Sequence, residues 1–174
     1  AMRLGWLRDF SALSNEARQP LREFRSRTHS ASAAVGYGKA AMLFVMLRDQ
    51  IGEKAFRQGI RDFWAKNQFR VASWQELQVA FESASEQDLK AFFAGWLDAS
   101  GAPKLEARDA LIRPTGNRYR LDLVINQQGA PRISRLPIEV SAGSKRETHW
   151  ISLKQANEKV GVGLDFRPKL VRLD

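Results

Sequence analysis

Hydrophobic residues recur at two different spacings along this chain, helical in the first part and alternating in the second. Between Ala40 and Leu97 the apolar positions return every three or four residues, which predicts amphipathic helices. After Lys104 they alternate with polar residues, as in half-buried strands. The pattern predicts an α+β protein, with a helical bundle in residues 1–102 and a small antiparallel β-sandwich in residues 103–174.

The helical part contains four predicted helices. The first extends from about residue 40 to Gly52 and is apolar almost all round, so we expect it to be buried on every side. The second has a predicted inner face of four large apolar residues, namely Phe56, Ile60, Phe63 and Trp64. The third begins with a capping box in which Ser73 stands three residues before Glu76.

The same capping spacing recurs at Ser85 and Asp88, where it predicts the start of the fourth helix. That helix carries a wide apolar stripe: Leu89, Phe92, Phe93, Trp96 and Leu97. Gly101 and Pro103 end it in the order that is typical of helix C-termini.

The second part contains short alternating runs. The clearest are residues 118–125 and 136–140, and further runs are seen at 149–153, 159–164 and 169–173. Glycine and asparagine turns between them favour antiparallel strands over strands joined by helices.

Composition excludes some chemistry and leaves the partner open. The 174 residues include no cysteine, so disulfides and thiolate metal sites are excluded. The net charge of +9 could suit a nucleic acid, but the basic residues are spread over the chain. The one dense basic group is Arg18, Arg22, Arg25 and Arg27. We interpret it as a solvated face, and nucleic-acid binding is disfavoured.

No targeting or membrane segment is predicted. The longest apolar run, residues 40–47, is far shorter than the roughly 20 residues that cross a bilayer. The N-terminus lacks the pattern of a secretory signal, so we expect a soluble chain and leave its compartment open. Ala1 before Met2, and an end at Asp174 directly after a strand-like run, suggest a piece of a longer protein.

Tyr37 stands between two glycines at the mouth of the first helix, which suggests a phenol on a flexible hinge. The pair Gly38 and Lys39 has a superficial likeness to a phosphate-binding loop. That loop needs a glycine and a hydroxyl where this chain has Ala33 and Ala40, so phosphate binding is not predicted.

Neither a metal site nor a serine hydrolase is predicted within the chain. A zinc site most simply uses two histidines one helical turn apart, but the two histidines are His29 and His149, one in each part. No Gly-x-Ser-x-Gly sequence provides an exposed nucleophile. We expect each histidine to be an ordinary surface or hydrogen-bonded residue.

Several motifs between residues 33 and 106 follow one another in a familiar order: Tyr37-Gly38-Lys39-Ala40-Ala41-Met42, Leu47-Arg48, Ile51-Gly52-Glu53-Lys54-Ala55-Phe56, Ala72-Ser73-Trp74, Asp88-Leu89, Phe92-Phe93, Trp96-Leu97 and Gly101-Ala102-Pro103. This order resembles the second half of the catalytic domain of the zinc aminopeptidases of the gluzincin clan, the membrane alanyl aminopeptidase and leukotriene hydrolase type. The strand-rich tail resembles the small β-sandwich that follows that domain in many members.

The resemblance implies a catalytic role for Tyr37. In that family a tyrosine in a Tyr-x-Lys-Gly-Ala motif faces the zinc across the substrate and donates a hydrogen bond to the oxyanion. Tyr37 is at the matching position, while Ala40 replaces the usual glycine. Without the resemblance, Tyr37 would be interpreted as a core residue with its hydroxyl at the rim.

The resemblance also implies a site that this chain does not complete. The His-Glu-x-x-His helix and the later glutamate ligand would lie upstream of residue 1, so the parent protein would hold the zinc and this chain none. The partners would be a peptide substrate and that upstream zinc-binding segment. The parent is expected to be a zinc metallo-aminopeptidase, whereas the 174 residues alone are not expected to hydrolyse a peptide.

Two alternatives remain at this point. The chain could be a non-catalytic basic module that binds an acidic partner or nucleic acid, using its charge and the aromatic residues Trp6, Phe10 and Phe24. It could also belong to a family member that has lost its zinc ligands and kept the scaffold for assembly.

Overall fold

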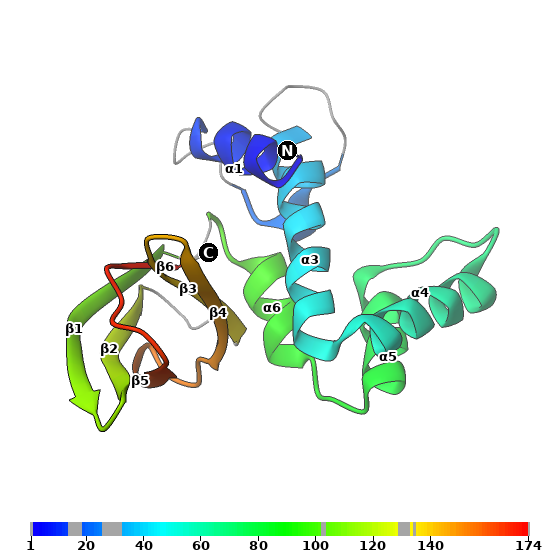
Figure 1. The fold of residues 1–174 in the computed structure, drawn as a ribbon. Coiled ribbons are helices and arrows are strands. Elements are labelled where there is room, and N and C mark those ends of the chain that lie inside the picture. The colour runs from blue at the N-terminus through cyan, green and yellow to red at the C-terminus, as the bar shows by residue number, and fades with distance from the viewer. Residues whose placement is uncertain are drawn as a thin grey trace. The chain divides into compact units, whose positions relative to one another are not determined.

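The computed structural model describes residues 2–13, 19–25, 33–101, 104–128, 133 and 135–173. The chain divides into two compact units, a helical unit Ala1–Ala102 and a β unit Pro103–Asp174 (Figure 1). The predicted α+β class is confirmed. Among the helices of these residues, none is both long enough and apolar enough to cross a membrane.

The helical unit consists of short elements in the order α1 Met2–Ser11, η1 Leu21–Glu23, η2 Ala34–Lys39, α3 Ala40–Ile51, α4 Glu53–Asn67, α5 Trp74–Ser85 and α6 Lys90–Asp98. The η2 segment is a π-helical turn that continues directly into α3. Gly52 ends α3 as predicted, with a φ of 83° that favours glycine.

The core of this unit is formed by α3, α5 and α6 together with Leu21 of η1 and Val35 of η2, and α4 packs against α5. Its buried side chains include Leu43 and Leu47 of α3 and Phe81 of α5. The predicted stripe of α6 is fully confirmed, since all five of its residues are buried: Leu89, Phe92, Phe93, Trp96 and Leu97.

Helix α4 approaches α5 closely at Gly59. The ring of Phe56 on α4 stacks on that of Phe81, with centroids 5.3 Å apart. A Cβ at Gly59 would lie 2.4 Å from Cδ1 of Phe81, which is well inside van der Waals contact. Only glycine therefore admits this arrangement of the two helices.

Two burial predictions for the helices were wrong. Helix α3 was expected to be buried on every side, but only Leu43 and Leu47 are fully buried and its other apolar residues are half-buried. On α4, Ile60 and Trp64 remain 40% and 63% exposed. Their period groups them with Phe56, yet the contact with α5 covers only part of that face.

The first capping box is confirmed and the second was wrong. At α5, the hydroxyl of Ser73 accepts from the N–H of Gln75 at 3.1 Å, and Glu76 Oε2 accepts from the N–H of Ser73 at 2.8 Å. Ser85 instead ends α5 and donates to the carbonyl of Phe81 at 2.7 Å. Helix α6 has Leu89 as its N-cap and no side-chain cap, although Asp88 accepts from the N–H of Lys90 and Glu82 accepts from the N–H of Leu89, both at 2.9 Å.

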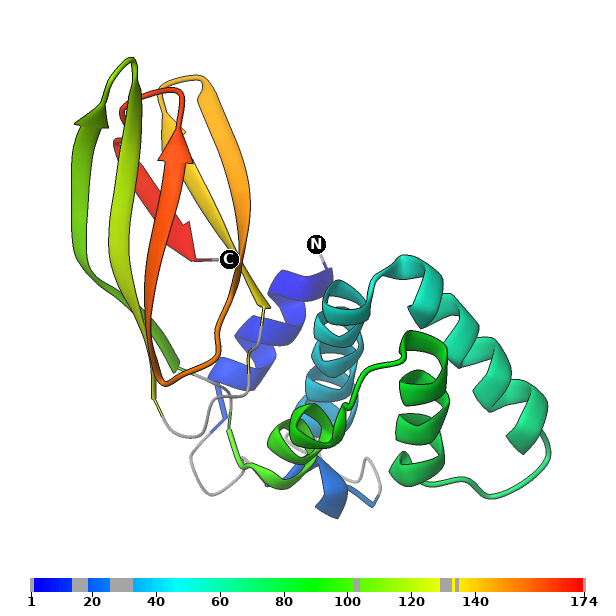
Figure 2. The ribbon, with the colours of Figure 1, turned by 90° about the horizontal axis from the view of Figure 1, so that it is seen from below.

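The β unit consists of strands β1 Lys104–Thr115, β2 Arg118–Gln128, β3 Arg135–Ala142, β4 Lys145–Ser152, β5 Asn157–Leu164 and β6 Leu170–Leu173. They form two antiparallel sheets with the strand orders β1-β2-β5 and β4-β3-β6. Alternate residues of both sheets share one core: Leu121, Leu123, Ile125, Leu136, Ile138, Val140, Val160, Val162 and Leu164. The predicted sandwich is confirmed (Figure 2).

Strand β1 was not predicted. It is an edge strand, paired only with β2, and most of its side chains are exposed, so its sequence does not alternate. Its pairing shifts register between Arg108 and Leu111, where Asp109 has a φ of 53°. A bulge of this kind moves the side-chain alternation by one position and hides the period of two.

Candidate functional site

Tyr37 lies in the π-helical turn η2, directly before the core helix α3. The turn is anchored from one side, because Val35, Gly38 and Lys39 are buried, while the side chain of Tyr37 is 55% exposed. π-Helical turns are rare and often occur at functional positions. The phenol is therefore exposed at the surface, while the neighbouring residues of the same turn are buried on its other side.

The glycines beside Tyr37 do not form a hinge. Both are helical, and each gives an aromatic ring access to the backbone. A Cβ at Gly36 would lie 2.3 Å from the ring of Phe24, whereas one at Gly38 would lie 3.7 Å from Cβ of Trp6, an ordinary contact. The expected flexibility was thus wrong, and Gly36 is the position at which close packing requires glycine.

Phe24 also contacts Tyr37 itself. The two rings meet edge to face, with centroids 5.9 Å apart and planes at 70°. This is a favourable geometry for an aromatic pair and restricts the phenol on one side. Phe24 follows directly after η1, so η1 contributes to the surroundings of Tyr37.

The side chain of Lys39 points into the protein. It is only 4% exposed, and its Nζ donates to the carbonyl of Ala99 at 2.5 Å. Ala99 comes directly after the last residue of α6, where the unpaired carbonyls and the helix dipole favour a cation. From the sequence, Lys39 is considered only in the phosphate-loop comparison and in the family motif, although a lysine beside an apolar segment is itself a signal of a buried polar contact.

A second cation binds the same end of α6. Arg22 of η1 donates from Nε to Oδ1 of Asp98 at 2.5 Å. The hydrogen bond from Arg22 to this carboxylate raises the pKa of Arg22 above its ordinary value. Residues 98 and 99 thus tie α6 to both η1 and η2, the two segments that hold the phenol.

Metal ligands do not come together in the described residues. Within the ranges given above, no group of three or more histidine, aspartate or glutamate side chains could hold a metal ion. His149 has the predicted hydrogen-bonded state, with Nε2 3.0 Å from Oε2 of Glu147, whereas His29 lies outside the described residues. The described side chains do not fit a zinc site, and we derive no reaction step through a metal from them.

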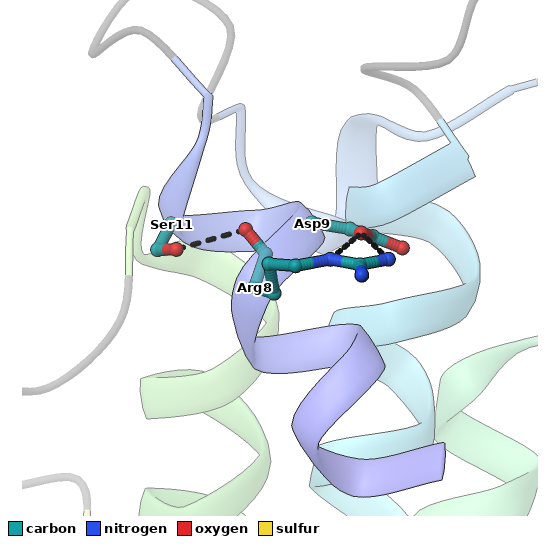
Figure 3. Close-up of polar contacts among 3 residues, drawn as sticks. All are labelled: Arg8, Asp9 and Ser11. Atoms are coloured by element: carbon teal, nitrogen blue, oxygen red, sulfur yellow. Dashed lines mark hydrogen bonds and ion pairs between the residues drawn. The ribbon is translucent and has the colours of Figure 1, made fainter. Parts of the chain in front are cut away.

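The basic group found in the sequence is only partly described, since Arg18 and Arg27 lie outside the described residues. Arg22 pairs with Asp98, and Arg25 is exposed. Nearby on α1, the guanidinium of Arg8 donates to Oδ1 of its neighbour Asp9 at 3.0 and 3.1 Å, and Ser11 Oγ donates to the carbonyl of Arg8 at 2.8 Å (Figure 3).

The aromatic residues considered for a nucleic-acid surface pack on the chain itself. Trp6 lies beside Gly38, and Phe24 contacts Tyr37. The side chain of Phe10 lies outside what the structure describes. The two described rings are thus half-buried against η2 and are not displayed for stacking on bases.

Comparisons with known proteins place these features in one family. A family model described as "Peptidase family M1 domain" matches residues 8–96, a range that includes Tyr37 and Lys39. Aminopeptidase N of Lactococcus lactis subsp. lactis is 32% identical over 83 residues, which is 46% of this chain and 10% of that protein. Aminopeptidase N of Haemophilus influenzae is 31% identical over 100 residues, 58% of this chain and 11% of that protein.

A solved structure extends the likeness in fold. The crystal structure of Legionella pneumophila aminopeptidase A in complex with aspartic acid superposes with a TM-score of 0.65 at 21% identity, covering 87% of this chain and 18% of that one. The matched segments span about a tenth of the length of the two curated relatives above. Because the family model covers half of the sequence, this chain belongs to peptidase family M1.

Proposed function

We propose that this chain is part of a zinc-dependent aminopeptidase and contributes a hydrogen-bond donor, Tyr37, and a wall of the substrate cleft. The observation that carries the proposal is the exposed phenol of Tyr37 on a turn whose opposite side is buried. Membership of peptidase family M1 and the names of the relatives support the reaction class.

The role of Tyr37 is electrostatic. Peptide hydrolysis passes through a tetrahedral intermediate in which negative charge develops on the former carbonyl oxygen, and a donor held in advance at that place stabilises it. Loss of one such donor typically costs about 3–4 kcal/mol of transition-state stabilisation. A phenol that is already restricted by Phe24 and by its helical backbone has little freedom left to lose in this task.

The remaining parts of the reaction belong to protein outside this chain. We propose that an upstream segment of the same polypeptide holds the zinc, which when bound polarises the substrate carbonyl. We propose further that residues 1–102 are the helical part of the catalytic domain and that residues 103–174 are a β-sandwich that follows it. The partners are then a peptide substrate and the upstream segment.

The test is Tyr37→Phe in the natural polypeptide that contains this chain. We expect turnover of an aminoacyl substrate to fall about a hundredfold, with unchanged zinc content and unchanged unfolding temperature, because the hydroxyl lies on a largely exposed side chain.

The matched control is Tyr119→Phe, which removes the hydroxyl of the only other tyrosine, in strand β2. Turnover in this control should stay at the level of the parent. If Tyr37→Phe were as active as the control, Tyr37 would have no part in the mechanism.

A further inference from the structure

We infer that Lys39 is a positioning residue for Tyr37, and that it acts by fastening the π-helical turn to the C-terminal end of α6. The inference rests on the proposed function of Tyr37 and adds to it a residue that does not touch the substrate.

The first step concerns the cost of burying a charge. The ammonium of Lys39 is almost completely buried, and such a group is tolerated only when hydrogen bonds compensate its lost hydration. Its Nζ donates to the carbonyl of Ala99, which lies at the negative end of the α6 dipole. Moving η2 away from α6 would strain or break this bond, so Lys39 resists displacement of the turn.

The second step concerns the path of contacts around the phenol. Lys39 follows Tyr37 by two residues in the same turn, so fixing Lys39 fixes the backbone from which the phenol extends. On the other side, Arg22 holds η1 to Asp98, and Phe24 meets the ring of Tyr37 edge to face. The buried contact of Lys39 is therefore the main restraint on the turn, and the exposed pair of Arg22 and Asp98 adds a weaker link on the side of Phe24.

The third step connects position with rate. A donor that shifts by about 1 Å can lose much of its effect on the transition state, with losses of up to about a hundredfold in turnover. Lys39 is buried, so its loss should leave substrate binding unchanged. A positioning residue of this kind should therefore change kcat while KM stays close to that of the parent.

The test is a double-mutant cycle with Lys39→Met and Tyr37→Phe in the natural polypeptide that contains this chain. Methionine keeps the length and apolar stem of lysine and removes the donor. We expect Lys39→Met alone to lower kcat by about tenfold or more. In the Tyr37→Phe background it should lower kcat no further, because the group that it positions is gone.

The outcomes separate the two hypotheses. If Tyr37→Phe leaves turnover unchanged, the proposed function fails. If Tyr37→Phe lowers turnover and Lys39→Met lowers it equally in both backgrounds, the proposed function stands and the positioning role of Lys39 is wrong. Lys90→Met, an exposed lysine on α6, is the matched control and should leave kcat unchanged.

A readout without catalysis tests the same inference in the natural polypeptide that contains this chain. Amide hydrogen exchange in residues 34–39 should become faster in Lys39→Met than in the parent, while exchange in α5 stays the same. Unchanged exchange in η2 would overturn the anchoring role.

If Lys39→Met does not fold, Phe24→Leu provides the second variant, because it removes the ring contact and leaves the hydrogen bond from Lys39 to Ala99 in place. It too should lower kcat only when Tyr37 is present. An equal loss with and without the hydroxyl of Tyr37 would count against restraint of the phenol from both sides.

Discussion

The positions of the side chains are determined by different kinds of contact in the helical unit and in the β unit. In the β unit, alternate residues such as Leu121 and Leu123 point into one core between two sheets. In the helical unit, the candidate residue Tyr37 is held by a buried lysine, an edge-on ring and a glycine that admits that ring. Alternation specifies the fold of the β unit, whereas the contacts named in the helical unit are specific to the surroundings of the candidate residue Tyr37.

The comparisons with known proteins follow the same division. The family model matches residues 8–96, which lie within the helical unit, while the fold likeness covers 87% of the chain and so extends into the β unit. A β-sandwich can be built from many sequences that share only the alternation of apolar residues. In the helical unit, close packing also requires glycine at Gly36 and Gly59, which alternation alone does not specify.

The largest expected effect on stability is the loss of a core side chain in the β unit. Ile138 of β3 is fully buried and lies between β4 and β6 in its sheet. Ile138→Ala should lower the free energy of unfolding by about 2–5 kcal/mol, as measured by urea unfolding, because it leaves a cavity in a closed core. The matched control is Leu111→Ala, at a position 46% exposed, which should change this free energy by less than about 0.5 kcal/mol.

The same substitution tests whether the two cores are separate. The described residues of the two core clusters have no member in common. Hydrogen exchange should therefore show faster opening of β2 to β5 in Ile138→Ala, with unchanged protection in α3 and α5. Equal loss of protection in both units would show that the two cores do not open independently.

A smaller effect is expected from adding one methyl group where α4 and α5 meet. A Cβ at Gly59 would lie 2.4 Å from Cδ1 of Phe81, a ring that is fully buried and stacked on Phe56. Gly59→Ala should lower the free energy of unfolding by about 1–3 kcal/mol. This cost outweighs the gain of about 0.5–1 kcal/mol that alanine usually brings inside a helix.

The matched control for that substitution is Gly5→Ala in α1. Among the described atoms, none lies within 4 Å of the added Cβ at Gly5. The same glycine-to-alanine substitution should therefore raise the free energy of unfolding by up to about 1 kcal/mol. Thermal unfolding of both variants measures the contrast, and a loss of stability of equal size in both would refute close packing as its cause.

The sequence predicted those features of the fold that depend on contacts within one segment, and missed those that depend on contacts with distant residues. The α6 stripe, the α5 cap and the strands with regular alternation were predicted, because each depends on spacing within one segment. The exposure of Trp64 was not predicted, because the helical period of apolar residues does not show how much of that helix face is covered by the neighbouring helix. The burial of Lys39 depends on the carbonyl of Ala99, sixty residues away. Such a contact has no signature in spacing.

The motif around Tyr37 suggested a family but led to a wrong physical account of its glycines. A Gly-Tyr-Gly sequence is compatible with a hinge and with close packing, and only the position of the Phe24 ring distinguishes the two. Similarly, Ser85 and Asp88 have the spacing of a capping box, but Glu86 takes a left-handed conformation that ends α5 between them. In both cases the sequence allowed two local structures, and tertiary contacts selected one.

The smallest effects are expected at the exposed capping box of α5. Ser73→Ala removes the acceptor for the N–H of Gln75 and should lower the free energy of unfolding by about 1 kcal/mol. Ser85→Ala is the matched control, because its hydroxyl only donates to the carbonyl of Phe81 within a formed helix. Urea unfolding of the two variants should rank Ser73→Ala as the more destabilising, and the reverse order would contradict the capping role.

The capping box of Ser73 and Glu76 should also make the free energy of unfolding of the helical unit decrease slightly at acidic pH. Glu76 accepts hydrogen bonds from the hydroxyl and the N–H of Ser73, and the hydroxyl contributes most to holding the pKa of Glu76 below its ordinary value. A carboxyl group with a lowered pKa in the folded state contributes stability that is fully present above its unfolded pKa and is lost as the pH falls through the folded pKa. Urea unfolding from neutral pH down through that range should show a smaller acid-induced loss for Glu76→Gln than for the parent, with Ser73→Ala in between. Identical acid dependence in all three proteins would mean that the ionised form of Glu76 makes no contribution to the cap.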